Sequence, residues 1–229
     1  MGSVEIEDIK GEKLNRPSRA GNPAIGNPGA LGLFSFGSTT FILSLFNLQT
    51  RGIHTPNVVI GMAIFCGGLA QVLAGMWEFP RGNAFGATAL THLSPPAFTS
   101  YGAFWMSYAT ILLPASGILS AYQDEKELAN ALGIFLSAWF IVTVLIFIAS
   151  LRKFMGLILL FACLAVTFLL LAAAEFTTTT NAKASLTKAG GATGLVTAFI
   201  AFFVGLGGLL AAEEVPVIQL PVGVYKKTN

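Results

Sequence analysis

The sequence predicts an all-α membrane protein with six transmembrane helices and both termini in the cytoplasm. Three observations lead to this fold class. Of the 229 residues, 54% are hydrophobic and only 10% are charged, whereas a soluble domain carries about 25% charged residues. Six long stretches of the chain contain no Asp, Glu, Lys or Arg. The lysines and arginines that separate these stretches are concentrated on one side of the predicted membrane.

Residues 1–25 form a polar tail, and the first span follows it. The tail lacks the apolar centre of a secretory signal, so we expect the first span to insert without being cleaved. Asn27 can accept a hydrogen bond from the free amides of a first helical turn, and Pro28 occupies the first helical position, where proline is tolerated. No charge follows until Arg51, a length that crosses a hydrocarbon core of about 30 Å.

Each of the other uncharged stretches also holds one helix, because a charge at mid-bilayer costs about 2.5 kcal/mol or more. The third stretch, residues 82–123, is too long for one straight helix and too short for two spans with an ordinary turn. We expect a transmembrane domain over residues 26–212 and a cytoplasmic tail over 213–229. The expected spans are about 29–49, 57–77, 84–114, 130–151, 154–174 and 190–211.

The basic residues predict the orientation. With a cytoplasmic N-terminus, nine lysines and arginines lie on the inner side and four on the outer side, namely Arg51, Lys126, Lys183 and Lys188. Because basic residues concentrate in cytoplasmic loops, this distribution places both termini inside. No basic run with interleaved aromatic residues exists, which excludes a nucleic-acid partner.

The composition of the spans argues against an enzyme. The chain has only two histidines, His54 and His92, and no carboxylate is expected deep in any span. A nucleophile beside a base, or a cluster of metal ligands at the usual spacing, is therefore missing. We expect no catalytic residue, no metal and no cofactor.

Uncharged polar residues inside the spans are more informative. A lone Ser or Thr on a membrane helix usually bonds its own carbonyl ladder, whereas the amide of Gln71 needs a partner helix, water or a solute. Pore lining and interhelical bonding are equally compatible with Gln71. A solute anion would rely on amide and hydroxyl donors and on helix N-termini, because no cation lies in a span. The candidates for lining a pathway are Asn27, Thr39, Thr40, Gln71, Asn83, Thr88 and Thr167.

Several ordered motifs resemble one family. The first span starts with Asn-Pro-Gly-Ala-Leu-Gly-Leu at residues 27–33. This start is similar to the Asn-Pro-Ala-Pro-Leu-Gly-Leu signature of the acetate uptake transporters. The shared residues include Asn27, Pro28, Leu31 and Gly32. These are the acetate/succinate permeases, whose fungal members are also called ammonia-transport-outward proteins. Further matches lie at 67–71, 75–78, 82–88 and 100–105, and the resemblance covers about residues 20–225.

The resemblance implies a fold and a function. It implies six helices around a central pore, a homo-oligomer that is a hexamer, a plasma-membrane location in the lipid bilayer, and passage of acetate coupled to protons. It also implies that Phe36, Tyr101 and Leu164 narrow the pore, and that Gln71, Asn83 and Thr167 face it. From residue type alone, Phe36 and Leu164 would be read as ordinary packing.

Two departures from the family pattern stand out. Gly29 and Ala30 replace an alanine and a proline of the signature, which loosens the start of the helix. About eight additional residues, roughly 90–97, carry Pro95 and Pro96 into the predicted third span. Two prolines in mid-span would break the helix. Either the break presents His92 to the pore, or the segment is an unspliced piece of the gene, and we favour the second, which sequencing of the transcript would decide.

Three functions are compatible with these features. The first is transport of acetate and other short monocarboxylates, proton-coupled or through a proton-linked channel. The second is a membrane sensor or trafficking protein with a non-conducting pore. The third is ammonium export, which predicts acidic or aromatic cation sites within the spans and ranks low because no carboxylate is expected there.

Overall fold

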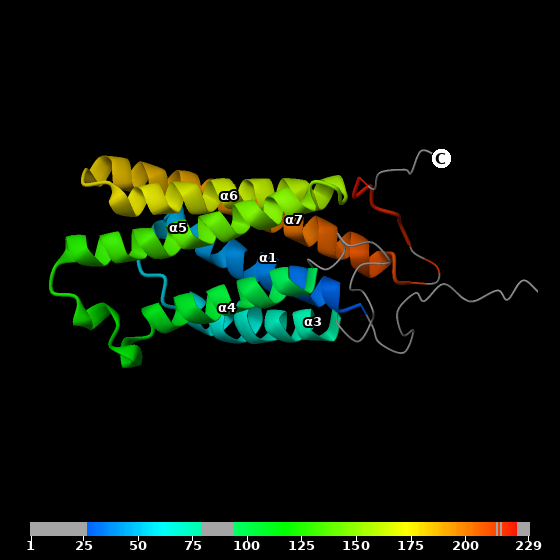
Figure 1. Ribbon diagram of the computed structural model, residues 1–229, viewed down its shortest axis with the longest axis horizontal. Coiled ribbons are helices and arrows are strands. Elements are labelled where there is room, and N and C mark those ends of the chain that lie inside the picture. The colour runs from blue at the N-terminus through cyan, green and yellow to red at the C-terminus, as the bar shows by residue number, and fades with distance from the viewer. Residues whose placement is uncertain (1–26, 79–93, 214, 216, 224–229) are drawn as a thin grey trace, which may run out of the picture.

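The computed structural model describes residues 27–78, 94–213, 215 and 217–223, and these residues form a bundle of helices without strands. The long helices lie side by side along the long axis of the molecule (Figure 1). Five of them are α1 Pro28–Asn47, α4 Ser94–Leu112, α5 Glu125–Ser150, α6 Met155–Phe176 and α7 Thr180–Leu210. Another continuous helical rod spans Val59–Glu78. It consists of α2 Val59–Gly61, the π-helix η2 Met62–Ala70 and α3 Gln71–Glu78. Short 3₁₀ turns occupy Thr50–Gly52, Pro114–Ser116 and Leu119–Ala121.

Five of the described helices are long and apolar enough to cross a membrane: α1, the rod Val59–Glu78, α5, α6 and α7. Helix α4 has 19 residues, several of them hydroxyl-bearing, and is not among the five. Along α5 a stripe of large apolar side chains, Ile134, Ile141, Leu145 and Ile148, is exposed at i, i+7, i+11 and i+14. Such a surface is typical of a helix that faces lipid or another subunit.

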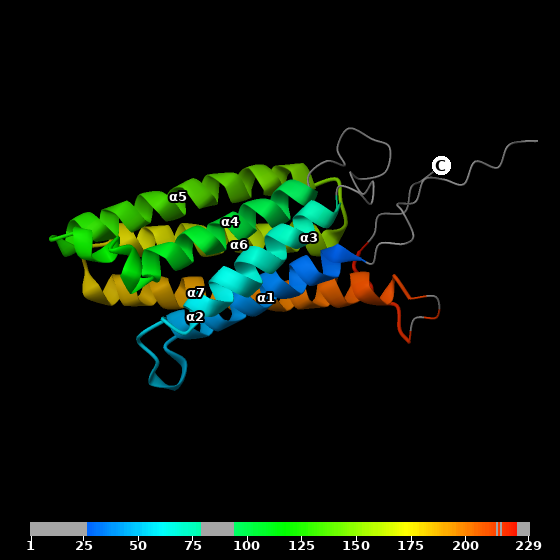
Figure 2. The ribbon, with the colours of Figure 1, turned by 90° about the horizontal axis from the view of Figure 1, so that it is seen from below.

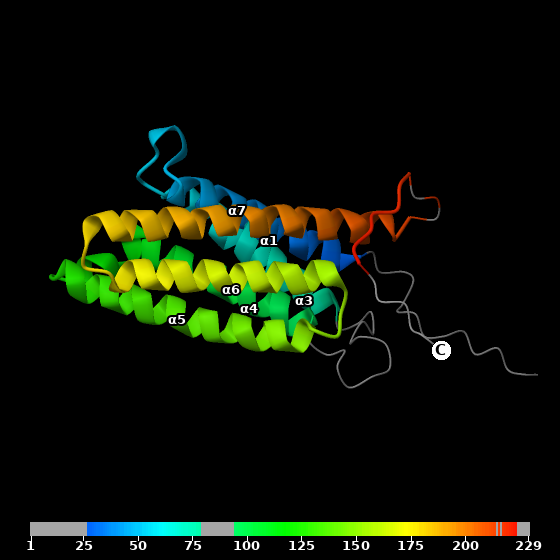
Figure 3. The same cartoon turned by 90° about the horizontal axis from the view of Figure 1, so that it is seen from above.

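The helices run alternately up and down the bundle. The turns that follow α1, α4 and α6 lie together at one end, and the described C-terminal residues lie at the other end with residue 27 (Figures 2 and 3). We call these the Asn47 end and the Asn27 end, after the last residue of α1 and the residue that precedes it. Asn27 and the C-terminal segment share an end because the described chain crosses the bundle an even number of times.

Helix α1 is packed closely on two sides. A side chain at Gly67 of η2 would collide with Thr39, and one at Gly194 of α7 would collide with Ser44. Glycine at these positions lets the neighbouring helices approach the backbone of α1, as small residues do in membrane bundles. Four hydroxyl-bearing residues of α1 are consequently buried: Ser35, Thr39, Thr40 and Ser44.

The start of α1 follows the sequence prediction. The side chain of Asn27 accepts a hydrogen bond from the Gly29 amide at 3.1 Å, and Pro28 occupies the first helical turn. The Asn27 amide nitrogen also donates to the Gly208 carbonyl at 2.8 Å, which ties the beginning of α1 to the end of α7.

Helix α4 covers the described part of the expected third span. Its described part begins at Ser94, and Pro95 and Pro96 are the second and third residues of that part. His92 and the first part of the predicted span lie outside the described residues.

Helix α7 begins ten residues before the predicted start at 190. Lys183 and Lys188, which the sequence analysis assigned to an outer loop, are part of this helix. Lys183 Nζ pairs with Glu175 Oε2 at 2.7 Å, and this ion pair joins the first turn of α7 to the last turn of α6. Lysine is a good helix former, so the two lysines are compatible with an earlier start of the helix.

Candidate functional site

Two cavities lie inside the bundle, and Phe36 of α1 borders both. The Asn27-end cavity has a volume of about 340 Å³ and is lined from α1, α3, α4, α5, α6 and α7. The Asn47-end cavity has a volume of about 120 Å³ and is lined from α1, α4, α5, α6 and α7. Among the described residues Phe36 alone lines both, and it is only 4% exposed. Its ring therefore separates the two spaces.

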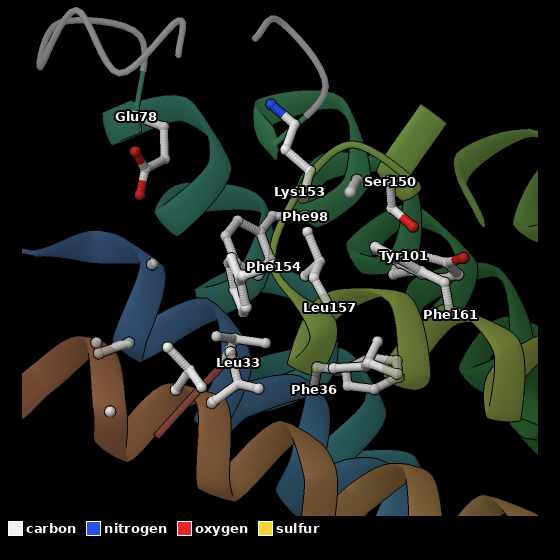
Figure 4. Close-up of a pocket in the computed structure, with 18 of the residues that line it drawn as sticks. Leu33, Phe36, Glu78, Phe98, Tyr101, Ser150, Lys153, Phe154, Leu157 and Phe161 are labelled. Atoms are coloured by element: carbon white, nitrogen blue, oxygen red, sulfur yellow. The ribbon is translucent and has the colours of Figure 1, made fainter. Parts of the chain in front are cut away.

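The structure brings Phe36, Tyr101 and Leu164 together in one buried cluster. The rings of Phe36 and Tyr101 have centroids 5.7 Å apart, and Tyr101 stacks on Phe161 at 6.1 Å. Tyr101 lines the Asn27-end cavity, and Leu164 lines the Asn47-end cavity. The three residues named from the resemblance thus lie where the two cavities meet, and Figure 4 shows Phe36, Tyr101 and Phe161 at the inner end of the Asn27-end cavity.

The hydroxyl of Tyr101 is held by α5. It donates a hydrogen bond to Thr143 Oγ1 at 3.0 Å, and Thr143 Oγ1 donates to the Trp139 carbonyl at 2.7 Å. Thr143 is fully buried, so this chain of bonds sets the orientation of the Tyr101 ring within the cluster.

Three buried polar atoms have no hydrogen-bond partner among the described residues: Thr40 Oγ1, Gln71 Oε1 and Trp105 Nε1. Gln71 lines the Asn27-end cavity, whereas Thr40 and Trp105 line the Asn47-end cavity. An unpartnered buried polar atom costs about 1–3 kcal/mol. All three atoms belong to residues that line a cavity.

Comparison with known proteins agrees with this architecture. Residues 11–224 match the GPR1/FUN34/yaaH family. The chain belongs to this family. It is 43% identical over 189 residues to Ammonia transport outward protein 2 of Saccharomyces cerevisiae, covering 82% of this chain and 63% of that one. It is 34% identical over 204 residues to the succinate-acetate/proton symporter SatP of Escherichia coli strain K12, covering 89% and 98% of the two chains.

A solved structure, that of the bacterial acetate channel SatP, shares the fold. The TM-score is 0.70 at 32% identity, and the match covers 86% of this chain and 99% of that chain. Two Saccharomyces cerevisiae relatives are 43% identical to this chain, Ammonia transport outward protein 2 and Accumulation of dyads protein 2. The matched segment covers less than two thirds of the length of each. The family membership inferred from the sequence motifs is therefore confirmed, as is the all-helical fold.

The remaining pathway candidates of this GPR1/FUN34/yaaH chain divide into three groups. Asn27 lines the Asn27-end cavity, and Thr167 lines the other, with its hydroxyl bonded to the Cys163 carbonyl at 2.9 Å and to Thr193 Oγ1 at 3.0 Å. Thr39 lines neither cavity, because the close approach of η2 covers it and its hydroxyl donates to the Ser35 carbonyl at 2.9 Å. Asn83 and Thr88 lie outside the described residues.

The signature at the start of α1 has a structural role in this family member. Pro28 and Gly32 are buried, and a side chain at Gly32 would collide with the ring of Phe98 in α4. Leu31 is 50% exposed on the outer surface. The motif therefore positions α1 against α4 and α7 and leaves Leu31 facing outward.

Charged residues line both cavities, which the sequence analysis missed. Glu78, only 2% exposed, and Lys153 line the Asn27-end cavity, and Figure 4 shows both toward its outer end. Glu175 lines the Asn47-end cavity and pairs with Lys183. Partial burial lowers the pKa of Lys153 below that of an exposed lysine. In the sequence, Glu78, Lys153 and Glu175 border the uncharged stretches, a position that indicates the end of a span but not whether the side chain lines a cavity.

Proposed function

We propose that this chain transports acetate and other short monocarboxylic acids across a membrane together with protons. The observation that supports this best is the pair of cavities that meet at Phe36, each lined by a residue with an unpartnered buried polar atom. Mostly apolar walls with a few polar groups suit weak, repeated binding of a small solute with one apolar and one polar end. The name of the Escherichia coli relative supports the same solute class and the coupling to protons.

The solute passes from one cavity to the other at the cluster of Phe36, Tyr101 and Leu164. This cluster acts as the constriction, Thr40 and Thr167 line the path on its Asn47 side, and Gln71 and Asn27 line it on the other. Lys153, which lines the Asn27-end cavity, attracts the anionic form of the solute. No catalytic step is required.

The chain crosses the plasma membrane six times, with α4 as the sixth span and both termini in the cytoplasm. Packing of α4 against α3 and η2, through Gly102 and Gly68, supports its place inside the bundle. This orientation puts the Asn27 end in the cytoplasm. The exposed apolar stripe of α5 faces lipid or a neighbouring subunit in a homo-oligomer, which we take to be a hexamer from the family resemblance.

Flux through liposomes tests the proposal. The purified full-length chain is reconstituted, and uptake of labelled acetate is measured with and without a pH gradient, acid outside. We expect saturable uptake that the gradient accelerates, with empty liposomes as the control. A membrane sensor with a closed pore would give uptake equal to that of empty liposomes, which would refute transport.

Ammonium export is the second candidate. Glu78 and Glu175 line the cavities and could attract a cation, and the yeast relative carries an ammonia transport name. The same liposomes separate the two candidates. Ammonium flux that exceeds acetate flux at equal driving force, and that Glu78→Gln abolishes, would favour export of ammonium.

A further inference from the structure

Glu175 is the one charged residue that lines the Asn47-end cavity in the described part of the chain. It is the last but one residue of α6, and 21% of its side chain is exposed. Its Oε2 pairs with Nζ of Lys183 in α7 at 2.7 Å, but Lys183 does not line the cavity and its side chain is 42% exposed. The ion pair therefore presents its carboxylate to the cavity and its ammonium to the surface.

The rest of the described wall around this cavity is uncharged at neutral pH. Its side chains are aliphatic, aromatic or hydroxyl-bearing, apart from the amide of Asn47. Tyr108 of α4 is the other titratable residue in this wall, and a tyrosine stays neutral at pH 7. The wall thus carries one negative charge, and the lysine that offsets it lies outside the wall.

A fixed carboxylate repels a solute in proportion to the negative charge that the solute carries. A neutral acid is not repelled, a monoanion is repelled once, and a dianion is repelled about twice as strongly. The cavity has a volume of only about 120 Å³, so both carboxylates of a short diacid lie close to its wall. The wall therefore distinguishes solutes by their number of charges.

We infer that Glu175 is a specificity-determining residue that disfavours dicarboxylates relative to monocarboxylates at the Asn47 end of the path. Lys183 limits the repulsion, because its ammonium offsets part of the charge and lets a monoanion enter. This inference rests on the proposed function and adds the residue that restricts the solutes to acids with one carboxyl group.

Malonate and propionate test the inference, because each has three carbons and they differ by one carboxylate. Uptake of both labelled acids is measured at pH 7, where all their carboxyl groups are ionised, in proteoliposomes of the full-length chain. Glu175→Gln should raise the ratio of malonate to propionate uptake about threefold or more, since one unit charge a few ångström away changes such an equilibrium severalfold.

Lys183→Gln should shift the same ratio in the opposite direction. It leaves the Glu175 carboxylate without its partner, so the repulsion of the dianion becomes stronger. Lys188→Gln is the matched control, because Lys188 is an exposed lysine of the same helix that lines neither cavity. It should leave the ratio unchanged.

A purely structural ion pair would give a different pattern. If the pair only joined α6 to α7, both variants would weaken the same contact and change the uptake of both acids by the same factor. An unchanged ratio, or a shift in the same direction in Glu175→Gln and Lys183→Gln, would therefore overturn the inference. A salt bridge between partly exposed groups contributes little to stability, so we expect both variants to fold, and either one alone decides the sign.

The outcomes also separate the inference from the proposed function. If the wild type takes up propionate but no malonate, the appearance of malonate uptake in Glu175→Gln supports the inference, and its continued absence overturns it. In both cases transport of monocarboxylates stands. Absence of acetate uptake by the wild type would instead refute the proposed function.

Discussion

The ring of Phe36 lies against the ring of Tyr101, with centroids 5.7 Å apart and planes inclined at 57°. Phe36 belongs to the first helix and Tyr101 to α4, and their contact lies where the two cavities meet. A bulky aromatic pair at this place can limit the size of a passing solute, because neither ring can move without disturbing the cluster around Phe161.

Phe36→Ala should widen the passage between the cavities. We expect faster uptake of acids larger than acetate, such as butyrate, relative to acetate, and a loss of about 3 kcal/mol in unfolding free energy from the lost packing. Labelled uptake in liposomes measures the first effect. Phe41→Ala on the same helix is the control, since Phe41 contacts Phe199 and Phe202 and lines neither cavity. Unchanged selectivity in Phe36→Ala would argue against the constriction.

Tyr101→Phe should lower stability with little effect on uptake. The substitution removes the hydrogen bond to Thr143 and keeps the ring, while Thr143 retains its bond to the Trp139 carbonyl. We expect a loss of about 1 kcal/mol, seen as a lower Tm in detergent. Tyr108→Phe serves as the comparison for stability, because Tyr108 is another tyrosine of α4 that is partly buried and lines the Asn47-end cavity. A complete loss of uptake in Tyr101→Phe would mean that the hydroxyl itself contacts the solute.

Asn27→Ala should loosen the Asn27 end of the bundle. It removes the cap on the Gly29 amide, worth about 1 kcal/mol, and the bond to the Gly208 carbonyl, worth about another 1 kcal/mol. Thermal unfolding measures the sum. Asn27→Asp keeps the acceptor for Gly29 and loses the donor to Gly208, so its loss should be smaller. Equal losses in the two variants would show that the cap contributes nothing.

Lys153→Gln should weaken uptake of the anion. Partial burial lowers the pKa of Lys153, so the ammonium is lost at a lower pH than in an exposed lysine. Because the folded pKa lies below the unfolded one, the folded state binds fewer protons between the two values, and stability rises as pH increases through that window. Lys153→Gln should remove this rise and should reduce acetate uptake at pH 7 about threefold, and at pH 5 less.

Arg152→Gln is the matched control for Lys153→Gln. Arg152 is the exposed neighbour of Lys153 and lines neither cavity. It should leave uptake at both pH values unchanged. A threefold loss in both variants would point to a general surface charge effect rather than to Lys153 at the cavity.

Gly223→Ala should detach the C-terminal segment from α6. The carbonyls of Val222 and Gly223 accept hydrogen bonds from the amides of Gly156 and Met155, at 3.1 and 3.0 Å. Gly223 has a φ of +76°, and an added Cβ would lie 2.6 Å from the Met155 Cβ. We expect amide exchange at Met155 and Gly156 to accelerate at least tenfold. Val222 lines the Asn27-end cavity, so that cavity should also open more widely.

Gly52→Ala controls for the backbone conformation in this experiment. Gly52 has the same φ of +76° but has nothing within 4 Å of an added Cβ. It should therefore cost about 1–2 kcal/mol through its backbone alone, without any change at α6. If Gly223→Ala leaves exchange at Met155 and Gly156 as slow as Gly52→Ala does, the contact with Met155 does not hold the segment.

Local features of the sequence predicted the helices well. The cap formed by Asn27 and the position of Pro28 were predicted correctly, because capping depends only on residues within one turn. The early start of α7 could not be read from charge alone. Lys183 and Glu175 are eight residues apart on two different helices, and the packing of α6 on α7 brings them together.

The sequence by itself determined that the chain is an apolar, all-helical member of the GPR1/FUN34/yaaH family, because composition, uncharged stretches and ordered motifs are properties of the linear chain. Only the tertiary structure decided which polar residues meet a cavity. Thr39 and Thr40 are neighbours in sequence, yet Thr39 is covered by η2 and Thr40 lines the Asn47-end cavity. Adjacent residues on a helix point about 100° apart, so their roles depend on which helices pack on each side.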